Sequence, residues 1–210
     1  MTFPRPLFVV LCAAVACGTA ADTTPKPSPD DALRAEILAR AARDQSQMRA
    51  LATSPNDSLA QRAMRSTLRD NVRWLDSIVV ARGHWPGLTE VDSSGANAAF
   101  LLAQHGDSVP EAQARLLDAL RQAVTAKEAS GSQLAFLEDR VRKAQGKPQL
   151  YGTQVAYDTA ANPVQPLVEA PDSLDIRRAS VGLPPMADYL KHMRDVNAQL
   201  RAMSPPKARP

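Results

Sequence analysis

Cysteine is almost absent from this sequence, and its two copies, Cys12 and Cys17, both lie near the start. Downstream of Cys17 the chain therefore has no disulfide, no thiol nucleophile and no thiolate metal site. A fold without these cross-links must be stabilised by its hydrophobic core, and a chain of 210 residues is long enough to build one.

Aromatic residues and net charge are also scarce. Phe, Trp and Tyr make up 4% of the sequence, which argues against a large β-sandwich. The formal charge is only +3, and the first half has no dense block of Lys and Arg, so the sequence predicts no nucleic-acid partner. The hydrophobic share of 44% excludes a wholly disordered chain, and the length fits one domain with appendages.

Residues 1–21 have the pattern of an export signal. Arg5 precedes an apolar run at 7–16, which is too short to span a bilayer. Ala-Val-Ala-Cys-Gly at 14–18 is similar to a lipoprotein cleavage site, where Cys17 becomes the lipidated first residue, whereas the small residues at 18–20 permit ordinary cleavage before Ala21. We favour lipidation of Cys17, with a Pro- and Thr-rich tether at 18–29.

Helical periodicity dominates the sequence from residue 30 onward. Asp30 or Asp31 can cap a first helix, residues 54–58 separate it from a second, and Gly83 and Pro86 end the second. Further helices are predicted at 96–104, 109–128, 132–145, 172–180 and 186–203, of which the one at 96–104 is apolar nearly all round.

The periodicity changes between residues 150 and 169. Val, Tyr and Thr are enriched there on both sides of a turn at 160–163, which predicts a small β-hairpin. The sequence thus predicts a mainly α fold, a single-domain antiparallel bundle of about six to seven helices over residues 30–203 with one hairpin. The tail at 204–210 is predicted to be disordered.

The second predicted helix has an arginine-rich outer face. It is formed by Arg62, Arg65, Arg69 and Arg73. Such a face can contact phosphates or anionic lipid. Because Asp70 and Asp76 are interleaved in the sequence, we interpret it as a solvated helix face.

Histidine is the first candidate for acid–base chemistry, since no cysteine remains in the domain. His84 lies in a turn and His105 at a helix end, so both can point into a cleft, whereas His192 is expected to be exposed on the last helix. A metal site made of His84, His105 and Asp107 lacks any diagnostic spacing, and we predict none. The alternative is that both histidines cap backbone carbonyls.

Two further segments carry candidate binding residues. Asp139 and Arg140 lie in the middle of an amphipathic helix, so one of them must approach the buried side. An ion pair or a hydrogen bond to a loop is the expected role, and anion binding by Arg140 is the alternative. Tyr151 and Gln154 open the hairpin and can hydrogen-bond a ligand, or pack on the helices and pair with backbone.

Five motifs in order are similar to those of an uncharacterised bacterial family, catalogued as domain of unknown function 6624. They are Gly-His-Trp-Pro at 83–86, Gln-His-Gly-Asp at 104–107, Leu-Ala-Phe-Leu-Glu-Asp-Arg-Val at 134–141, Gln-Leu-Tyr-Gly-Thr-Gln at 149–154, and Arg178 with Val-Gly-Leu at 181–183. The resemblance covers roughly residues 33–195 and departs mildly at Gly106 and Phe136. It implies no activity, substrate or cofactor.

Together these residues suggest one site. We expect a pocket lined by His84, Gln104, His105, Arg140, Tyr151 and Gln154. The rival interpretation is that the same groups tie the hairpin to the helices by buried hydrogen bonds.

The function that the sequence favours is a lipid-anchored domain of the bacterial cell envelope that binds a small ligand or an envelope protein. The alternative is a hydrolase-like enzyme with His84 or His105 as general base and Arg140 holding an anion. A third possibility is a structural partner that presents the hairpin edge. The sequence indicates no cofactor, and the expected location is the periplasm or the outer membrane, with soluble export as the alternative.

Overall fold

A computed structural model describes residues 30–203 of the chain. These residues form seven α-helices and one two-stranded antiparallel sheet, which confirms the predicted mainly α fold with a hairpin. Contacts divide the chain into two compact units, residues 1–112 and 113–210. The predicted export signal, the tether and the tail at 204–210 lie outside the described residues.

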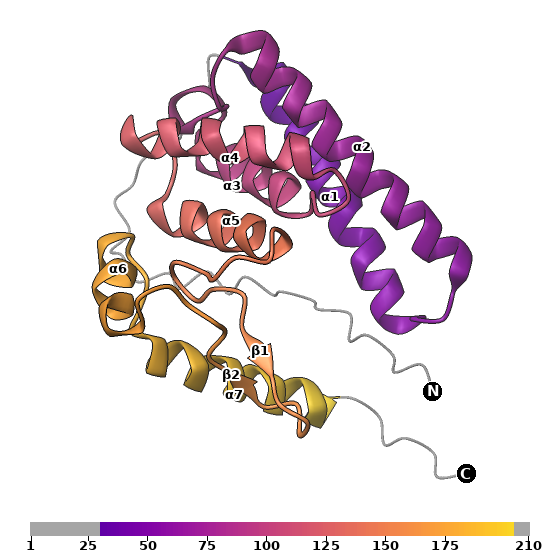
Figure 1. Ribbon diagram of the computed structural model, residues 1–210. Helices are drawn as coiled ribbons and strands as arrows, with labels where there is room; N and C mark the ends of the chain where they lie inside the picture. Colours follow the sequence, from indigo (N-terminus) through magenta and orange to yellow (C-terminus); the bar gives the residue numbers. More distant parts are fainter. Residues whose placement is uncertain (1–29, 204–210) are drawn as a thin grey trace, which may run out of the picture. The chain divides into compact units, whose positions relative to one another are not determined.

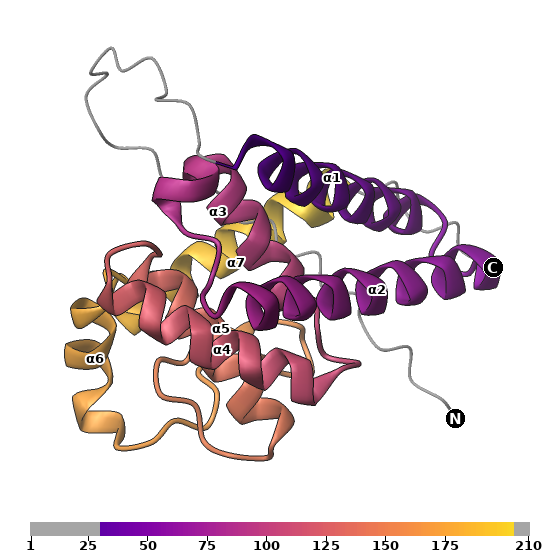
Figure 2. The same cartoon turned by 90° about the horizontal axis from the view of Figure 1, so that it is seen from above.

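The first unit is built on a long helical hairpin of α1 (Asp31–Thr53) and α2 (Ser58–Arg82), which lie side by side in Figure 2. Asp30 caps α1 by accepting a 3.1 Å hydrogen bond from Leu33 N, as the sequence predicts. Asp57 caps α2 in the same way, and Gly83 ends α2 with a φ of 75°.

Helix α3 (Leu88–Gln104) provides the centre of this unit. Its Ala99, Leu102 and Ala103 are fully buried, in agreement with the prediction that this helix is apolar nearly all round. The helix begins earlier than predicted, at Leu88. It consists of two helical stretches that follow each other directly, with a kink at Asp92 between them. The φ of Asp92 is 55°, and its side chain caps the second stretch through Ser94 N and Gly95 N.

The second unit contains most of α4 (Pro110–Thr125), α5 (Gly131–Ala144), α6 (Leu174–Ser180) and α7 (Met186–Met203). A 3-10 turn, η1 (Pro171–Ser173), leads into α6. Val168, Leu174 and Met186 form a small core, against which Val155, Tyr189 and Leu190 pack.

The hairpin is shorter than its sequence suggests. Strands β1 (Ala156–Tyr157) and β2 (Pro163–Val164) pair antiparallel, with Ala156 opposite Val164. Proline at positions 163 and 166 removes N–H donors from the second arm, so the ladder does not extend. Gln149 instead makes an isolated parallel bridge to Val168. None of the helices in the described region is both long and apolar enough to cross a membrane.

Candidate functional site

A carboxylate occupies a position in the apolar row of α1. The buried residues of this helix are Leu33, Ile37, Ala41, Asp44 and Leu51, at the three- and four-residue spacing of one helix face. Asp44 is 0% exposed. A buried charged group needs a compensating partner. The surroundings of Asp44 are therefore a candidate functional site.

His105 is that partner. Its Nδ1 lies 2.8 Å from Asp44 Oδ2, and its side chain is 10% exposed. An ionised carboxylate only accepts hydrogen bonds, so Nδ1 carries the proton and donates it. Nε2 then faces away from Asp44 and has no hydrogen-bond partner among the described residues. A histidine held in this way presents a defined nitrogen for a ligand or for proton transfer.

Single polar atoms on α1 and α2 are also buried without partners in the described part of the chain. Asp44 Oδ1, Gln47 Oε1 and Asn71 Nδ2 have none among the described residues. On the preceding turn of α1, Arg40 Nη1 donates to Asn71 Oδ1 at 3.3 Å, and its guanidinium lies 4.3 Å from the ring centroid of Trp74. Since a buried polar group without a hydrogen bond is costly, these atoms indicate a region suited to a polar molecule.

His84 has different surroundings. Its Nε2 lies 2.6 Å from Glu90 Oε1 and its Nδ1 lies 2.9 Å from the carbonyl oxygen of Arg82. Both neighbours are acceptors, so the ring fits the contacts best when both nitrogens are protonated. The hydrogen bond to Glu90, supported by that to the Arg82 carbonyl, raises the pKa of His84 above its usual 6.5.

The two histidines do not share a site. His84 contacts the first turns of α3, whereas His105 is the residue that ends this helix. Even after the break at Asp92, the helix separates them by roughly 20 Å at ~1.5 Å per residue. The structure therefore does not bring these two candidate residues together. No three His, Cys, Asp or Glu residues of the described part are grouped to hold a metal ion.

In the second unit, Asp139 is the residue of the predicted Asp139–Arg140 pair that is buried, at 0% exposed. Its Oδ1 accepts from Leu150 N at 2.7 Å and from Tyr151 N at 3.1 Å. Its Oδ2 accepts from Thr153 N at 2.8 Å and from Thr153 Oγ1 at 2.9 Å. The prediction that this pair supplies a hydrogen bond to a loop is confirmed. Arg140 is half-buried on α5, and anion binding by it stays a prediction.

Gln154 belongs to the same arrangement. Its backbone N–H donates to Gln149 Oε1, and its side-chain Nε2 donates to the carbonyl oxygen of Phe136 at 3.4 Å. Gln149 Nε2 donates in return to the carbonyl oxygen of Gln154. These contacts support the rival interpretation for this segment, in which polar motif residues fasten the loop to α5.

Tyr151 and Gly152 pass close to buried side chains. Fully buried Arg178 donates from Nη1 to the carbonyl oxygen of Tyr151 at 2.6 Å. Burial raises the pKa of the Tyr151 hydroxyl, and the charges of Glu138 and Asp139 add to this. Gly152 has a φ of +68°, and a Cβ there would lie 3.3 Å from Met186 Sδ. The conformation and the close approach both favour glycine.

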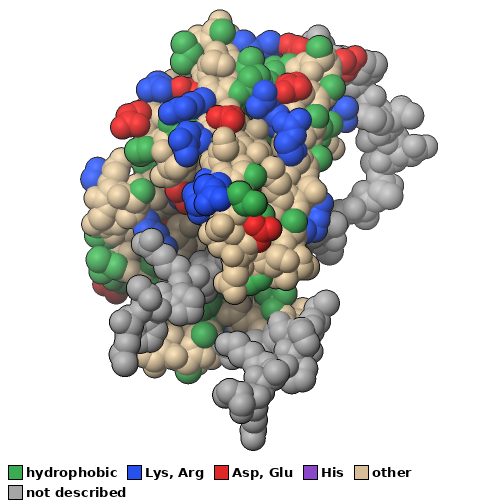
Figure 3. All heavy atoms as spheres, turned by 90° about the vertical axis from the view of Figure 1, so that its right-hand side faces the viewer, with side chains coloured by type: hydrophobic (Ala, Val, Ile, Leu, Met, Phe, Trp, Pro, Cys, Tyr) green, Lys and Arg blue, Asp and Glu red, His purple; other side chains and the backbone are tan. Residues whose placement is uncertain are grey.

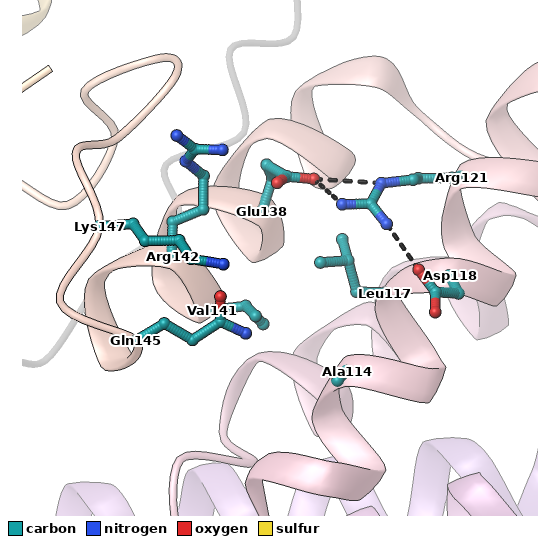
Figure 4. A pocket seen from close by; sticks show the side chains of 9 residues that line it. All are labelled: Ala114, Leu117, Asp118, Arg121, Glu138, Val141, Arg142, Gln145 and Lys147. Carbon is teal, nitrogen blue, oxygen red and sulfur yellow. Dashed lines mark hydrogen bonds and ion pairs between the residues drawn. The ribbon is translucent and has the colours of Figure 1, made fainter. Parts of the chain in front are cut away.

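A groove of about 320 Å³ lies between α4 and α5 (Figure 4). Arg121 reaches across it to Glu138 and, on its own helix, to Asp118. Arg142 donates to the carbonyl oxygen of Pro148 and pairs with Glu169. The lining residues are Ala114, Leu117, Asp118, Arg121, Glu138, Val141, Arg142, Gln145 and Lys147. None of the sequence-predicted site residues is among them, and the two arginines are already paired.

Asp44 and Asn71 were missed by reasoning from sequence, which followed apolar residues along α1 and α2. Both lie at the spacing of the apolar rows, and Asn71 is 1% exposed. A polar residue at a core position of an amphipathic helix was the signal that could have found them. His105 was identified, but its partner is 61 residues away in sequence.

One of three comparisons with known proteins identifies a family, and it agrees with the motifs. No curated protein matches the chain, and no solved structure matches it. A family model described as "Family of unknown function (DUF6624)" matches residues 29–201, which include the five motifs and all the described helices except the end of α7. The chain belongs to this family.

Proposed function

We propose that the protein is a lipid-anchored domain of the bacterial cell envelope that binds a small polar ligand at the Asp44–His105 pair. One observation carries the binding site. The buried Asp44 carboxylate lies in an apolar row, with one oxygen bonded to His105 and the other without a partner among the described residues. Replacing a buried ion pair by apolar side chains of similar volume is often neutral or stabilising, so stability alone does not account for a carboxylate in this row.

The chemistry of the unpartnered atoms suggests what binds. Asp44 Oδ1 and Gln47 Oε1 are acceptors, Asn71 Nδ2 is a donor, and the carboxylate is anionic. His105 is the exposed edge of this region, because its side chain is 10% exposed and that of Asp44 is 0% exposed. A ligand with a cationic or neutral N–H donor group fits these acceptors better than an anion does.

Three small probes of different charge test this proposal. Methylammonium, acetate and inorganic phosphate are added separately to the full-length chain, and the ring nitrogens of its histidines are followed by ¹⁵N NMR. We expect methylammonium to shift the His105 signals and acetate and phosphate to have little effect. His192, exposed on α7, is an internal control in the same sample.

The variant Asp44→Asn is the control protein, because Asn has nearly the same side-chain shape as Asp but carries no charge. It should abolish the response of His105 to methylammonium. If His105 responds to no probe more than His192 does, or responds equally in Asp44→Asn, the binding proposal is wrong.

The orientation of His105 also favours a second candidate, a hydrolase-like enzyme. A histidine whose Nδ1 donates to a buried carboxylate can remove a proton through Nε2, here from a water molecule. Hydrolysis of p-nitrophenyl acetate should then fall about 10³-fold in His105→Ala and remain unchanged in His192→Ala. Equal rates in the two variants would exclude His105 as general base.

Lipidation of Cys17 is supported by the sequence around it, Ala-Val-Ala-Cys-Gly at 14–18. Mass spectrometry of the protein expressed with its native leader should show an acylated cysteine at the mature N-terminus. A mature chain that begins at Ala21 would contradict this part of the proposal.

A further inference from the structure

Helix α2 carries a row of four exposed arginines, Arg62, Arg65, Arg69 and Arg73. At about 100° per residue, their positions fall within an arc of about 80° on the helix. The row extends over about 17 Å at ~1.5 Å per residue. The side chains therefore form one linear cationic surface, which we call the arginine row.

The carboxylates near this row make no ion pair with its arginines in the described residues. Asp76 is buried, at 9% exposed, and so is not part of the outer face. Asp57 is used as the N-cap of α2, and Asp70 accepts a hydrogen bond from Ser66. None of the four arginines has an ion pair or hydrogen bond among residues 30–203. The earlier interpretation as a face with interleaved opposite charges is therefore wrong for Asp76.

The chemistry of the surface favours phosphate groups. Every Lys or Arg residue in 30–112 is arginine. The planar guanidinium binds phosphate through two parallel hydrogen bonds, which the lysine ammonium cannot do. Figure 3 shows the side of the molecule on which α1 and α2 lie in Figure 1, and several basic side chains lie over its upper half with acidic side chains among them.

Two large apolar side chains accompany the row. Leu59, one turn before Arg62, is 70% exposed, and Val80, two turns after Arg73, is 65% exposed. Both project on the same side of α2 as the row, by the same count of about 100° per residue. The main apolar face of α2 is buried in the fold, so these two side chains can only add local apolar contact to the electrostatic attraction between the row and a membrane surface.

We propose that the arginine row of α2 is a docking surface for an anionic phospholipid membrane. A single small anion would need donors that converge, whereas these four groups are spread along a line that matches many headgroup phosphates. The surface is distinct from the Asp44–His105 pair, and the lipid anchor proposed above would bring it near its partner. Each arginine near an anionic surface should increase binding about fivefold.

Vesicle sedimentation tests the proposal on the full-length chain with Cys17→Ser, which cannot be acylated. The probes are vesicles of phosphatidylglycerol with phosphatidylcholine, and vesicles of phosphatidylcholine alone. We expect binding to the first to exceed binding to the second and to weaken as salt is added. Replacing Arg62 and Arg69 by Gln should weaken binding to the anionic vesicles about 20-fold.

The matched control replaces Arg43 and Arg49 of α1 by Gln; these arginines are also exposed, lack ion pairs among the described residues and carry the same charge. We expect it to weaken binding no more than about twofold, and helical circular dichroism should show that both variants fold. Equal losses in the two variants would show a general charge effect and overturn the proposal. Equal binding to both kinds of vesicle would do the same. Inhibition by inorganic phosphate at concentrations that leave ionic strength unchanged would identify a free anion as the ligand instead.

These outcomes are independent of the proposed function. The vesicle experiment uses a chain that cannot be lipidated, so a failure of the lipidation proposal does not change its result. Methylammonium binding at His105 uses none of the four arginines. Each proposal can therefore fail while the other holds.

Discussion

Two buried aspartates show how residues of the same type differ in their surroundings. Asp139 and Asp44 are each 0% exposed. Asp139 receives four hydrogen bonds from the loop at 150–153, whereas Asp44 receives one from His105 and leaves Oδ1 without a partner among the described residues. The first carboxylate is satisfied by the fold, and the second is not.

This difference predicts unequal costs for the same substitution. Asp139→Asn places an amide N–H against backbone donors and should lower the free energy of unfolding by about 3 kcal/mol. Asp44→Asn can still accept from His105, and should cost about 1 kcal/mol. Urea denaturation measures both. Asp118→Asn, at an exposed ion pair with Arg121, is the control and should change stability by less than about 0.5 kcal/mol. Equal costs for the two buried positions would contradict the distinction.

His84 predicts a pH dependence. Its pKa in the folded protein is raised above 6.5 by the hydrogen bonds to Glu90 and to the Arg82 carbonyl. The resulting stabilisation is fully present below pH 6.5 and is lost as the pH rises through the raised pKa of the folded state. Unfolding followed across this range should show the loss, and NMR titration of the ring should give the raised pKa directly.

The matched variant for His84 is Glu90→Gln. Because it removes the charged acceptor at 2.6 Å, the pKa of His84 should return toward 6.5 and the pH dependence should become weaker. An unchanged titration curve would show that Glu90 does not bind the ring in solution.

At the scale of elements, the ends of the helices were predictable because each is set by one or two local residues. Asp30, Asp57 and Gly83 perform the capping roles that their side chains and conformational freedom suggest. The start of α3 was not predictable, because it depends on a break at Asp92, whose carboxylate also pairs with Arg34 of α1. The predicted length of the hairpin is too great, because prolines interrupt the segment whose composition favours β-strands.

The C-cap of α2 gives a test at this scale. Gly83 has a φ of 75°, and a Cβ there would meet no atom within 4 Å. Gly83→Ala should therefore lower stability by about 1 kcal/mol through backbone strain alone. Thermal unfolding measures the loss. Gly95→Ala is a useful contrast, since its Cβ would lie 2.7 Å from Val91 Cβ and the cost should come from packing. If Gly83→Ala is as stable as the native protein, the left-handed cap does not exist in solution.

At the scale of the whole molecule, the fold class and the family followed from periodicity and ordered motifs, and both are confirmed. The candidate site could be predicted only in part. His105 could be predicted because it is a titratable residue at a helix end. Asp44 is 61 residues away in sequence, and its role as the partner of His105 depends on its burial and on the contact between α3 and α1. Such long-range contacts produce no characteristic residue spacing by which they could be predicted from the sequence.

The division into two units also changes how the candidate residues are grouped. His84 and His105 belong to the first unit, whereas Arg140, Tyr151 and Gln154 belong to the second. In the second unit, the contacts of Tyr151 and Gln154 are with the loop and helices around them. The proposed binding site therefore rests on residues of α1 and α3 alone.

The central claim is that Asp44 holds a proton on Nδ1 of His105 and leaves Nε2 for a ligand. The most direct measurement is ¹⁵N NMR of the His105 ring in the full-length protein and in Asp44→Asn. We predict a protonated Nδ1 and an unprotonated Nε2 in the native protein. In the variant we predict a mixture of tautomers, because the Asn amide can either accept from Nδ1 through Oδ1 or donate to it through Nδ2. A proton on Nε2 in the native protein, or the same spectrum in both proteins, would contradict the account.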